Sequence, residues 1–389
     1  MRNYIFLSLI WVLLSSSFPV SAKNTPYVWN IEHLKQVKSN PDKYPIYDRI
    51  LKAADSYARA TVPVVTNKKK QILEDRHYYV SMSTYYWPDE KNPNGEYVCI
   101  DGKKNPDVAD YDLTTIDLFG TYSKCLAVAY YLSGQQKYYD AFMKYIKAFF
   151  LDDETFMYPN MQYAQIVRGR KQLNGTSPGL VETQYLLPVL EAIKLVNDCK
   201  PIEQKTLKGL QDWFSEFIDW MLTSDLGVLQ KQNKGNIAIM YDIFLEDCAL
   251  FVGNKALAKK IVSDFEETRL KVQIKEDGSQ PTELRRATAF TYSLKSLGYI
   301  IDFCHLNEGT KYYKKHKKII DSAFLYLQQY IGHQEKFPYK QETSWDDCEK
   351  GYYSHVARLE YLAPRHNKSY NFNSIDKEAC YSSLTQLLY

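Results

Sequence analysis

Residues 112–151 read DLTTIDLFGTYSKCLAVAYYLSGQQKYYDAFMKYIKAFFL, and this stretch decides the fold class. Apolar residues recur at helical spacing over 118–130, the sequence Ser-Gly-Gln at 133–135 interrupts the pattern, and it restarts over 138–149. A helical pattern that stops at a glycine and resumes directly predicts two helices joined by a tight turn. The stretch is therefore interpreted as a helical hairpin.

The same periodicity continues along most of the chain, whereas alternating strand patterns are scarce. Further helices are predicted over 179–198, 202–223, 236–252, 255–270, 288–305, 311–332 and 372–388. Long helices paired through short breaks favour an all-α fold, an α/α toroid in which helical hairpins surround an axis. Because no linker, low-complexity tract or clear repeat interrupts the chain, residues 23–389 are predicted to form one domain.

The N-terminus has the pattern of a secretory signal. Arg2 precedes an apolar run from Ile5 to Leu14, and small residues follow up to Ala22, which predicts a cleavable signal peptide over 1–22. The apolar run is shorter than the ~20 residues of a spanning helix, and no later segment is expected to cross a membrane. No cysteine lies near the cleavage site, so a lipid anchor is not expected. The protein is predicted to be periplasmic or secreted.

Charge and cysteine usage exclude several classes of protein. Lys and Arg number 49 against 46 Asp and Glu, a formal net charge of +3, and no basic block indicates nucleic-acid binding. The seven cysteines are spread out without metal-ligand spacing, so neither a zinc site nor a disulfide scaffold is expected. Most are predicted to be buried thiols, although one or two disulfides are compatible with export. No metal or other cofactor is predicted.

Aromatic residues gather in the loops as well as in the helices. The 34 tyrosines could pack a large helical core, which is the favoured interpretation for most of them, or form flat platforms for sugars. Three polar, aromatic loops are expected at 77–107, 155–179 and 333–352, and long loops on a rigid scaffold often carry function. The chain lacks P-loop, dinucleotide-binding, zinc-protease and nucleophile-elbow motifs.

Residues 281–294, PTELRRATAFTYSL, contain an unusual charge cluster. Pro281 can begin a helix, and a helix is expected from about Thr282 to Ile300. Tyr292 is seven positions after Arg285, which is about two helical turns, so helical spacing puts these two residues on one face. The plain structural interpretation is a solvated helix with a weak ion pair between Glu283 and Arg286, one turn apart. The chemical interpretation is a guanidinium that favours the phenolate form of a tyrosine and so makes it a proton acceptor.

Three separated motifs resemble the alginate-lyase-like polysaccharide lyases. They are HYYVSMSTYYWPDEKNPNGEYVCIDGKKNPD at 77–107, TFMYPNMQYAQ at 155–165 and DGSQPTELRRATAFTYSL at 277–294. The resemblance implies an α/α toroid and cleavage of a uronic-acid polysaccharide by β-elimination, without a cofactor. In that reaction the C5 proton is removed once the charge of the neighbouring carboxylate is neutralised, and an acid assists departure of the C4 oxygen.

The resemblance also implies roles for individual residues. Tyr292 matches the catalytic acid and base, and Arg286, rather than the Arg285 that helical spacing favours, matches the arginine that lowers its pKa or steadies the substrate. Binding or neutralisation of the uronate carboxylate is implied for Asn160, Tyr163 and Gln165. The expected contacts with the sugar chain are His77, Tyr85, Tyr86, Trp87, Arg285 and Tyr241.

One motif departs from the family pattern. The stretch KGNIAIMYD at 234–242 matches a family segment whose Asn and His lie in the active site. Asn236 keeps the asparagine and is assigned to the catalytic set, but Ile237 stands where the histidine is expected, and isoleucine cannot accept a proton. Either Tyr292 acts as both base and acid, or another histidine (His77 or His355) enters the site, or catalysis is lost.

Three functions follow from these observations. The leading hypothesis is a polysaccharide lyase acting on an acidic glycan. A toroidal glycoside hydrolase would instead need two carboxylates across one cleft. A non-catalytic glycan-binding protein is the alternative that Ile237 favours.

Overall fold

The computed structural model describes residues 27–362 and residue 388, and helices dominate these residues. The α-helices are α1 (Ile31–Ser39), α2 (Ile46–Arg59), α3 (Asp112–Ser133), α4 (Gln136–Phe150), α5 (Leu187–Cys199), α6 (Gln204–Thr223), α7 (Asp225–Lys231), α8 (Asn236–Phe251), α9 (Lys255–Phe265), α10 (Lys271–Gln273), α11 (Pro281–Leu284), α12 (Ala289–Leu306), α13 (Thr310–Gln328) and α14 (Trp345–Leu362). The 3-10 or π segments are η2 (Pro41–Lys43), η3 (Pro106–Asp110), η4 (Ser177–Tyr185), η5 (Glu266–Leu270) and η6 (Gln334–Lys336). The strands are β1 (Val80–Met82), β2 (Tyr86–Trp87), β3 (Val98–Cys99) and β4 (Tyr163–Ile166).

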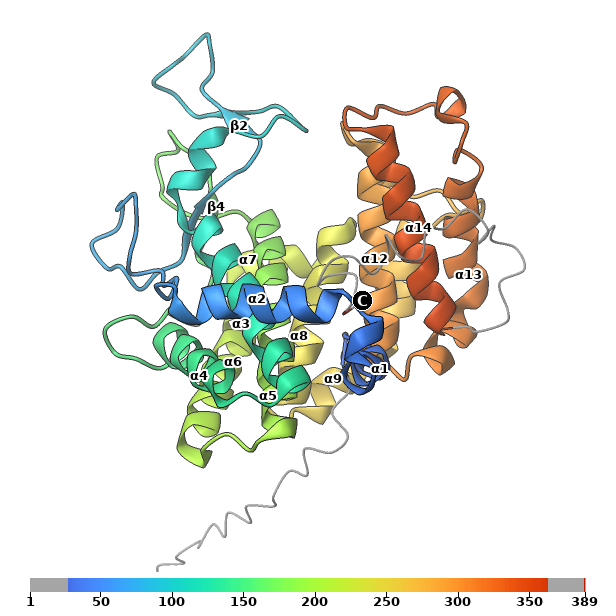
Figure 1. Cartoon of the computed structure of the whole chain (residues 1–389). Coiled ribbons are helices and arrows are strands. Elements are labelled where there is room, and N and C mark those ends of the chain that lie inside the picture. The colour runs from blue at the N-terminus through green and yellow to red at the C-terminus, as the bar shows by residue number, and fades with distance from the viewer. Residues whose placement is uncertain (1–26, 363–387, 389) are drawn as a thin grey trace, which may run out of the picture.

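The helices form two walls that face each other (Figure 1). One wall contains α3, which packs against α2, α4 and α5, and the other contains α12, which packs against α13 and α14. Helix α8 contacts α12 on one side and η4, α5 and α6 on the other, so it joins the two walls. The predicted α/α toroid is confirmed.

The predicted hairpin is present as α3 and α4. Helix α3 ends at Gly134, whose φ of 68° is left-handed and whose N–H donates to the carbonyl of Tyr130. A glycine adopts this conformation without the steric cost of a Cβ, so it stops the helix and reverses the chain. The rings of Phe119 and Phe149 stack with centroids 3.8 Å apart and hold the two helices together.

Two predicted helices are interrupted in the structure. The predicted 179–198 helix is a 3-10 segment, η4, followed by α5. The helix predicted from about Thr282 to Ile300 is split into α11 and α12. Between them, the N–H of Ala287 donates to the Asp101 carboxylate and that of Ala289 to the carbonyl of Lys340. These tertiary hydrogen bonds replace helical ones, which sequence periodicity cannot foresee. The predicted helix over 372–388 lies outside the described residues, apart from residue 388.

Short strands fix two of the predicted loops. In 77–107, β2 pairs antiparallel with β3, and β1 pairs in parallel with β4 from the loop 155–179. The two loops that carry the first two motifs are therefore bonded to each other. They lie above the wall formed by α3 (Figure 1).

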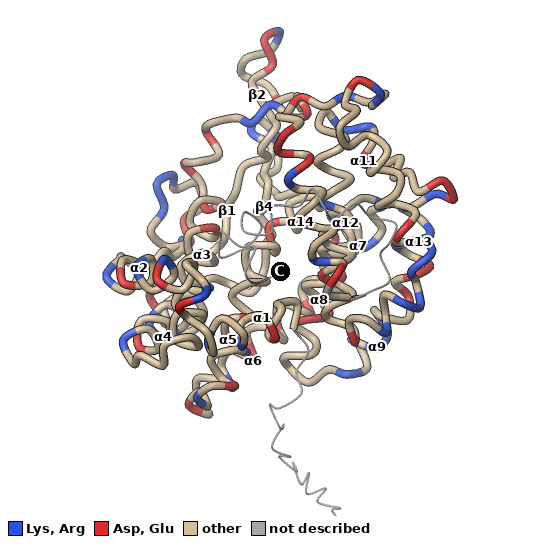
Figure 2. Tube along the Cα trace, turned by 45° about the vertical axis from the view of Figure 1, so that its right-hand side comes forward, with Lys and Arg blue, Asp and Glu red and all other residues tan. Residues whose placement is uncertain are grey.

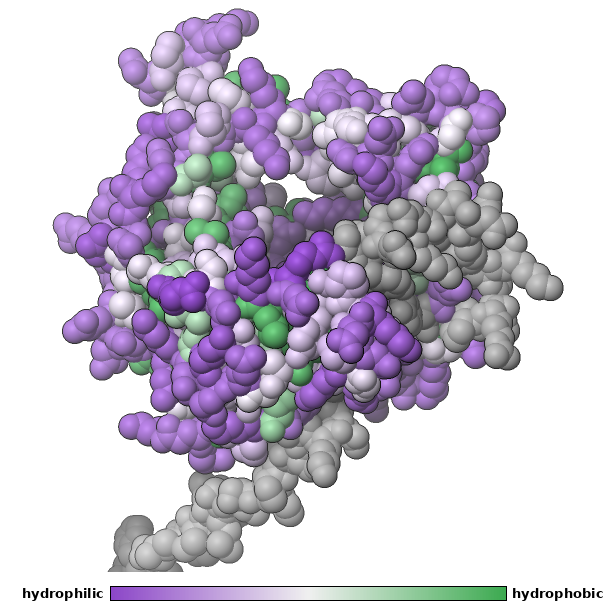
Figure 3. Space-filling model, in the orientation of Figure 1, coloured by the Kyte–Doolittle hydropathy of each residue, from purple (hydrophilic) through white to green (hydrophobic). Residues whose placement is uncertain are grey.

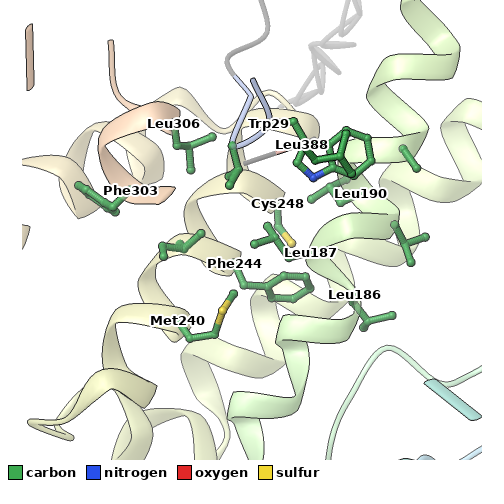
Figure 4. Close-up of a cluster of buried hydrophobic side chains, with 14 of the residues drawn as sticks. Trp29, Leu186, Leu187, Leu190, Met240, Phe244, Cys248, Phe303, Leu306 and Leu388 are labelled. Carbon is green, nitrogen blue, oxygen red and sulfur yellow. The ribbon is translucent and has the colours of Figure 1, made fainter. Parts of the chain in front are cut away.

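The core is one continuous cluster of buried apolar residues that runs through both walls. Where α8 passes between α5 and α12, Phe244 and Met240 pack among leucines of the neighbouring helices (Figure 4). Residue 388 meets the start of the described residues at this point, because Trp29 and Leu388 are both buried there and the N–H of Asn30 donates to the carbonyl of Leu388 at 2.7 Å.

Charged residues of both signs alternate around the outer helices (Figure 2). No helix of the described residues is long and apolar enough to cross a membrane. The described cysteines are all free thiols, and four of them are buried: Cys125, Cys248, Cys304 and Cys348. Cys380 and the predicted signal peptide lie outside the described residues.

A buried ion pair joins α8 to η5 and gives a test of the packing. The Arg269 guanidinium donates to Asp242 through Nε at 2.7 Å and Nη2 at 3.0 Å. Arg269→Met would leave a buried carboxylate without its counter-charge, so the free energy of unfolding should fall by about 3–5 kcal/mol. Lys260→Met, which breaks the exposed pair with Asp264, should cost less than about 1 kcal/mol. Urea unfolding measures both, and equal losses would contradict the assignment.

Candidate active site

Tyr292 lies where the first loop meets the break between α11 and α12. Its hydroxyl is 2.8 Å from that of Tyr85 in the loop 77–107. The guanidinium carbon of Arg286 lies 3.7 Å from the centroid of the Tyr292 ring, which is a cation–π contact. Two of the three sequence motifs therefore meet at this tyrosine.

Arg286 is held in place by Asp101. Its Nε donates to one carboxylate oxygen at 3.0 Å and its Nη2 to the other at 2.7 Å, while the N–H of Ala287 donates to Asp101 at 2.8 Å. A bidentate pair of this kind fixes the orientation of a guanidinium as well as its position. The Nη1 group of Arg286 makes no hydrogen bond to the described residues, so its donors are available to a ligand.

The prediction from helical spacing, which put Arg285 beside Tyr292, is wrong. Residues 285–288 are not helical, so seven residues do not amount to two turns. Arg285 is exposed, and the structure shows no hydrogen bond or ion pair for it within 27–362. Its expected contact with the sugar chain stays a prediction.

The pKa of Tyr292 is raised above its ordinary value, mainly because its phenol is buried and secondarily because it is hydrogen-bonded to Tyr85. The charge of Arg286 opposes this shift, which is the predicted direction of its effect, but burial outweighs it. Arg286 therefore acts in the predicted direction, while burial keeps the pKa of Tyr292 above its ordinary value. Tyr292 is a phenol at neutral pH and can donate a proton.

Asn236 lies at the first turn of α8, held by Glu283 of α11. Its backbone N–H donates to Glu283 Oε1 at 2.7 Å and its side-chain Nδ2 donates to Oε2 at 2.6 Å. Asn236 is 2% exposed and its buried Oδ1 has no hydrogen-bond partner among the described residues. Glu283 also lies close enough to Arg286 for the charge of one to act on the other. The part-buried Ile237 follows directly in α8.

Gln165 is strained and tightly bonded. Its φ of 53° is left-handed, a conformation that costs a non-glycine residue on the order of 1 kcal/mol. Its N–H donates to the hydroxyl of Ser81 at 2.7 Å, and its Nε2 donates to Glu182 at 3.0 Å. Glu182 is buried and also accepts from Tyr79 and Ser81. Strain that persists under such bonding is typical of functional loops.

The remaining residues of the first two motifs form an aromatic cluster. The His77 ring bonds through Nδ1 to the carbonyl of Phe156 at 2.6 Å and lies against the rings of Phe156 and Tyr158. Tyr163 packs edge-on against Tyr78 with ring centroids 5.1 Å apart. Nearby in sequence, Asn160 Oδ1 accepts from the N–H of Gln162 at 3.2 Å.

Tyr86 and Trp87 form the short strand β2, paired with Val98 and Cys99. The indole N–H of Trp87 donates to the carbonyl of Lys103, whose ammonium group lies 4.5 Å from the centroid of a Trp87 ring. Both aromatic side chains are part-buried. They are available as flat surfaces for a ligand.

Of two further predicted residues, Tyr241 lies in the core and His355 lines a cavity between the helices. Tyr241 is only 1% exposed, and its hydroxyl donates to the carbonyl of Met221 at 2.9 Å, so it is a core residue and the predicted sugar contact is wrong. His355 lies on α14 against Gly298 of α12. Burial lowers the pKa of His355 to about 3, so it is neutral.

A cavity of about 720 Å³ occupies the centre of the toroid between α3, α5, α12 and α14. Figure 3 shows the molecule hollowed between its two walls. Thr291 and Lys295, which flank Tyr292 on α12, line this cavity. The tyrosine therefore lies next to an open space that can hold a ligand.

Several residues of the site were not identified from the sequence. Asp101 was part of a quoted motif, but its pairing with Arg286 joins positions 185 residues apart. Glu283 was interpreted only as a helical partner of Arg286, and Glu182 was not singled out. The role of each depends on a hydrogen bond to a residue distant in sequence, and a local sequence motif cannot identify that residue. The described residues contain no group of three or more side chains that could hold a metal ion.

The helical toroid is the fold of the alginate-lyase type of polysaccharide lyase. The alginate lyase family profile matches residues 64–337, and the chain belongs to that family. An alginate lyase from Bacteroides ovatus, known from a crystal structure, is similar at 29% sequence identity and a TM-score of 0.81, over 92% of this chain and 93% of that one. Comparison with curated proteins found no match.

Glu182 gives a test of how the loop 155–179 is supported. Burial raises the pKa of Glu182 from 4.5 to about 7. The folded protein therefore binds this proton more tightly than the unfolded chain, and the resulting stabilisation is present below pH 4.5 and lost as the pH rises to about 7. Glutamine does not titrate, so Glu182→Gln should not lose this stabilisation as the pH rises.

Between pH 4.5 and about pH 7.5 the wild type should therefore lose on the order of 3 kcal/mol of unfolding free energy relative to Glu182→Gln. Urea titrations at several pH values measure it. Glu154→Gln, on an exposed turn, is the control. A pH-independent difference for Glu182→Gln would show that this carboxyl titrates normally.

Proposed function

We propose that the protein cleaves a uronic-acid-containing polysaccharide by β-elimination, with Tyr292 transferring the protons. The observation that carries the proposal is the contact of Tyr292 with Tyr85 on one side and Arg286 on the other, beside the central cavity. Membership of the alginate lyase family supports an acidic polysaccharide as substrate.

The first requirement of the reaction is neutralisation of the substrate carboxylate. The free Nη1 donors of Arg286 can bind one carboxylate oxygen while Asp101 keeps the guanidinium in place. Asn236 has an unpaired buried oxygen, which can accept a hydrogen bond from a protonated carboxyl group. Glu283 positions that amide. Gln165, Asn160 and Tyr163 are proposed to bind the same sugar from the loop side.

The second requirement is transfer of the C5 proton and protonation of the leaving O4. Ile237 provides no base, so Tyr292 is assigned both steps. When Tyr292 is ionised, the Tyr85 hydroxyl can donate to the phenolate and the guanidinium of Arg286 stabilises the charge. In the acid step the phenol returns the proton to O4. His77, Tyr85, Tyr86 and Trp87 are proposed to line the groove for the sugar chain.

A second candidate is a glycan-binding protein without catalysis. It is favoured by Ile237 and by the raised pKa of the Tyr292 phenol, both of which hinder proton abstraction. Both candidates bind the same polysaccharide, but only the lyase forms an unsaturated product, which absorbs ultraviolet light. A hydrolase would release reducing ends without that absorbance. Secretion through residues 1–22 stays a prediction.

Tyr292→Phe tests the catalytic assignment. Removing the hydroxyl should lower the rate of elimination by about 10²–10⁴-fold, because general acid–base catalysis is worth about that much. The ring over which Arg286 lies is kept, so binding of an oligouronate should change little. Ultraviolet absorbance follows elimination on alginate, glucuronan and glycosaminoglycans, and calorimetry follows binding.

Tyr139→Phe is the matched control, because this part-buried tyrosine lies on the outer helix α4. It should keep full activity. Activity retained in Tyr292→Phe would remove Tyr292 from its role, and activity absent from the wild type on every acidic glycan would favour the binding protein.

Asp101→Asn tests the positioning of Arg286. An amide cannot accept both donors of the guanidinium, so Arg286 should lose its fixed orientation and kcat/KM should fall by about tenfold or more. Glu96→Gln breaks the exposed ion pair of Glu96 with Arg170 in the same region and should leave kcat/KM within about twofold. Equal effects of the two substitutions would argue against a specific role of Asp101.

A further inference from the structure

Two lysines line the central cavity from opposite walls. Lys124 belongs to α3 and Lys295 to α12 (Figure 1). Neither ammonium group forms a hydrogen bond or ion pair within residues 27–362, and that of Lys295 lies 5.6 Å from the centroid of the Tyr299 ring. A buried lysine elsewhere in the core is paired with a carboxylate, since Lys194 donates to Asp247 at 2.6 Å. The cavity lysines differ in that no carboxylate of the described residues bonds to them, although Asp117 acts on Lys124 and Glu283 on Lys295 through their charge.

Leaving an ammonium group part-buried without an anion is unfavourable. Burial lowers the pKa of Lys295 to about 8 and also lowers that of Lys124. No acid of the cavity bonds to either lysine: Asp302 is bonded to Arg358, Asp347 is exposed, and Asp117, which is also exposed, acts on Lys124 only through its charge.

The cavity adjoins the proposed catalytic residue through α12, since Thr291 and Lys295 line it and Tyr292 lies between them in sequence. Lys295 follows Tyr292 by three residues on α12, so it lies about one helical turn further along the same face. Its charge is felt by Glu283 and Arg286, the residues that position Asn236 and contact Tyr292. The space also contains groups suited to a sugar, among them Gln184, Tyr185 and the buried Nδ1 of His355, which lacks a hydrogen-bond partner.

We propose that this cavity is a subsite for a second acidic group of the glycan, carried by the sugar next to the one at Tyr292, with Lys295 and Lys124 binding that group from the two walls. The inference rests on the proposed function and adds a specificity to it. The preferred substrate has acidic groups on neighbouring sugars, and a chain with isolated uronates is bound more weakly. The cavity volume of about 720 Å³ lies within the range of ~300–1,000 Å³ that is usual for ligand sites.

Binding without turnover tests the subsite. In the Tyr292→Phe background, calorimetry with a saturated oligouronate measures Kd for the parent and after Lys295→Met or Lys124→Met. Each substitution removes the charge and keeps most of the stem, so Kd should rise by about tenfold or more. Lys314→Met, on the exposed face of α13 outside the cavity, should leave Kd unchanged. Unchanged Kd in both cavity variants would overturn the proposal.

The chemistry of the ligand is tested with the methyl ester of the same oligosaccharide and with a sulfated one. The neutral ester should bind the parent and both cavity variants equally. A sulfated oligosaccharide that shows the same dependence on Lys124 and Lys295 would extend the subsite to sulfate, and one that does not would restrict it to carboxylate. Loss of binding caused by misfolding is recognised by thermal unfolding, because removing an unpaired buried charge should keep or raise Tm.

Kinetics in the wild-type background separate this proposal from the function on which it rests. Lys295→Met and Lys124→Met should raise KM about tenfold with a much smaller effect on kcat. If the wild type shows no elimination but binding depends on the lysines, the lyase fails and the subsite stands. If elimination occurs and the lysines affect neither KM nor Kd, the subsite fails and the lyase stands.

Discussion

The Arg286 guanidinium is the interaction on which the candidate site depends. It is bound by Asp101 through two hydrogen bonds and lies at 3.7 Å from the centroid of the Tyr292 ring. A planar cation can do both at once, since the donors point outward in its plane while its face contacts the ring. One side chain thereby connects the loop 77–107 to α12. Helix α12 in turn packs on α8, α13 and α14, so the loop is fixed relative to one wall of the toroid.

This arrangement requires an interruption in the helix. If residues 281–306 formed one continuous helix, the N–H groups of Ala287 and Ala289 would bond within it. Instead they donate to Asp101 in the loop 77–107 and to Lys340 in the loop 333–352. The break therefore costs few hydrogen bonds, because tertiary partners replace helical ones. It also places Arg286, rather than Arg285, against the ring of Tyr292.

Buried polar groups distinguish the site from the apolar core around it. Glu283 holds both the backbone and the side chain of Asn236, and Glu182 accepts from Tyr79, Ser81 and Gln165. Such networks restrict side chains to one arrangement, provided that each group has a partner. Among the described residues, Asn236 Oδ1 is left without a hydrogen-bond partner, and the two lysines without a bonded anion line the cavity where a ligand would bind. Unpaired polar groups in an otherwise bonded network are a physical reason to expect a polar, anionic ligand.

The sequence by itself determined the toroid, the hairpin of α3 and α4, and the segments that carry the site. Local helical periodicity and a glycine at 134 suffice for the hairpin, and ordered motifs suffice to mark Tyr292, Arg286 and Asn236. Only the tertiary structure decided which residues support them. Asp101, Glu283, Lys124 and Lys295 are polar residues of ordinary local sequence, and their significance lies in contacts across many residues. Burial, likewise, set the pKa of Tyr292 and put Tyr241 in the core, because exposure depends on how helices pack rather than on the pattern within any one of them.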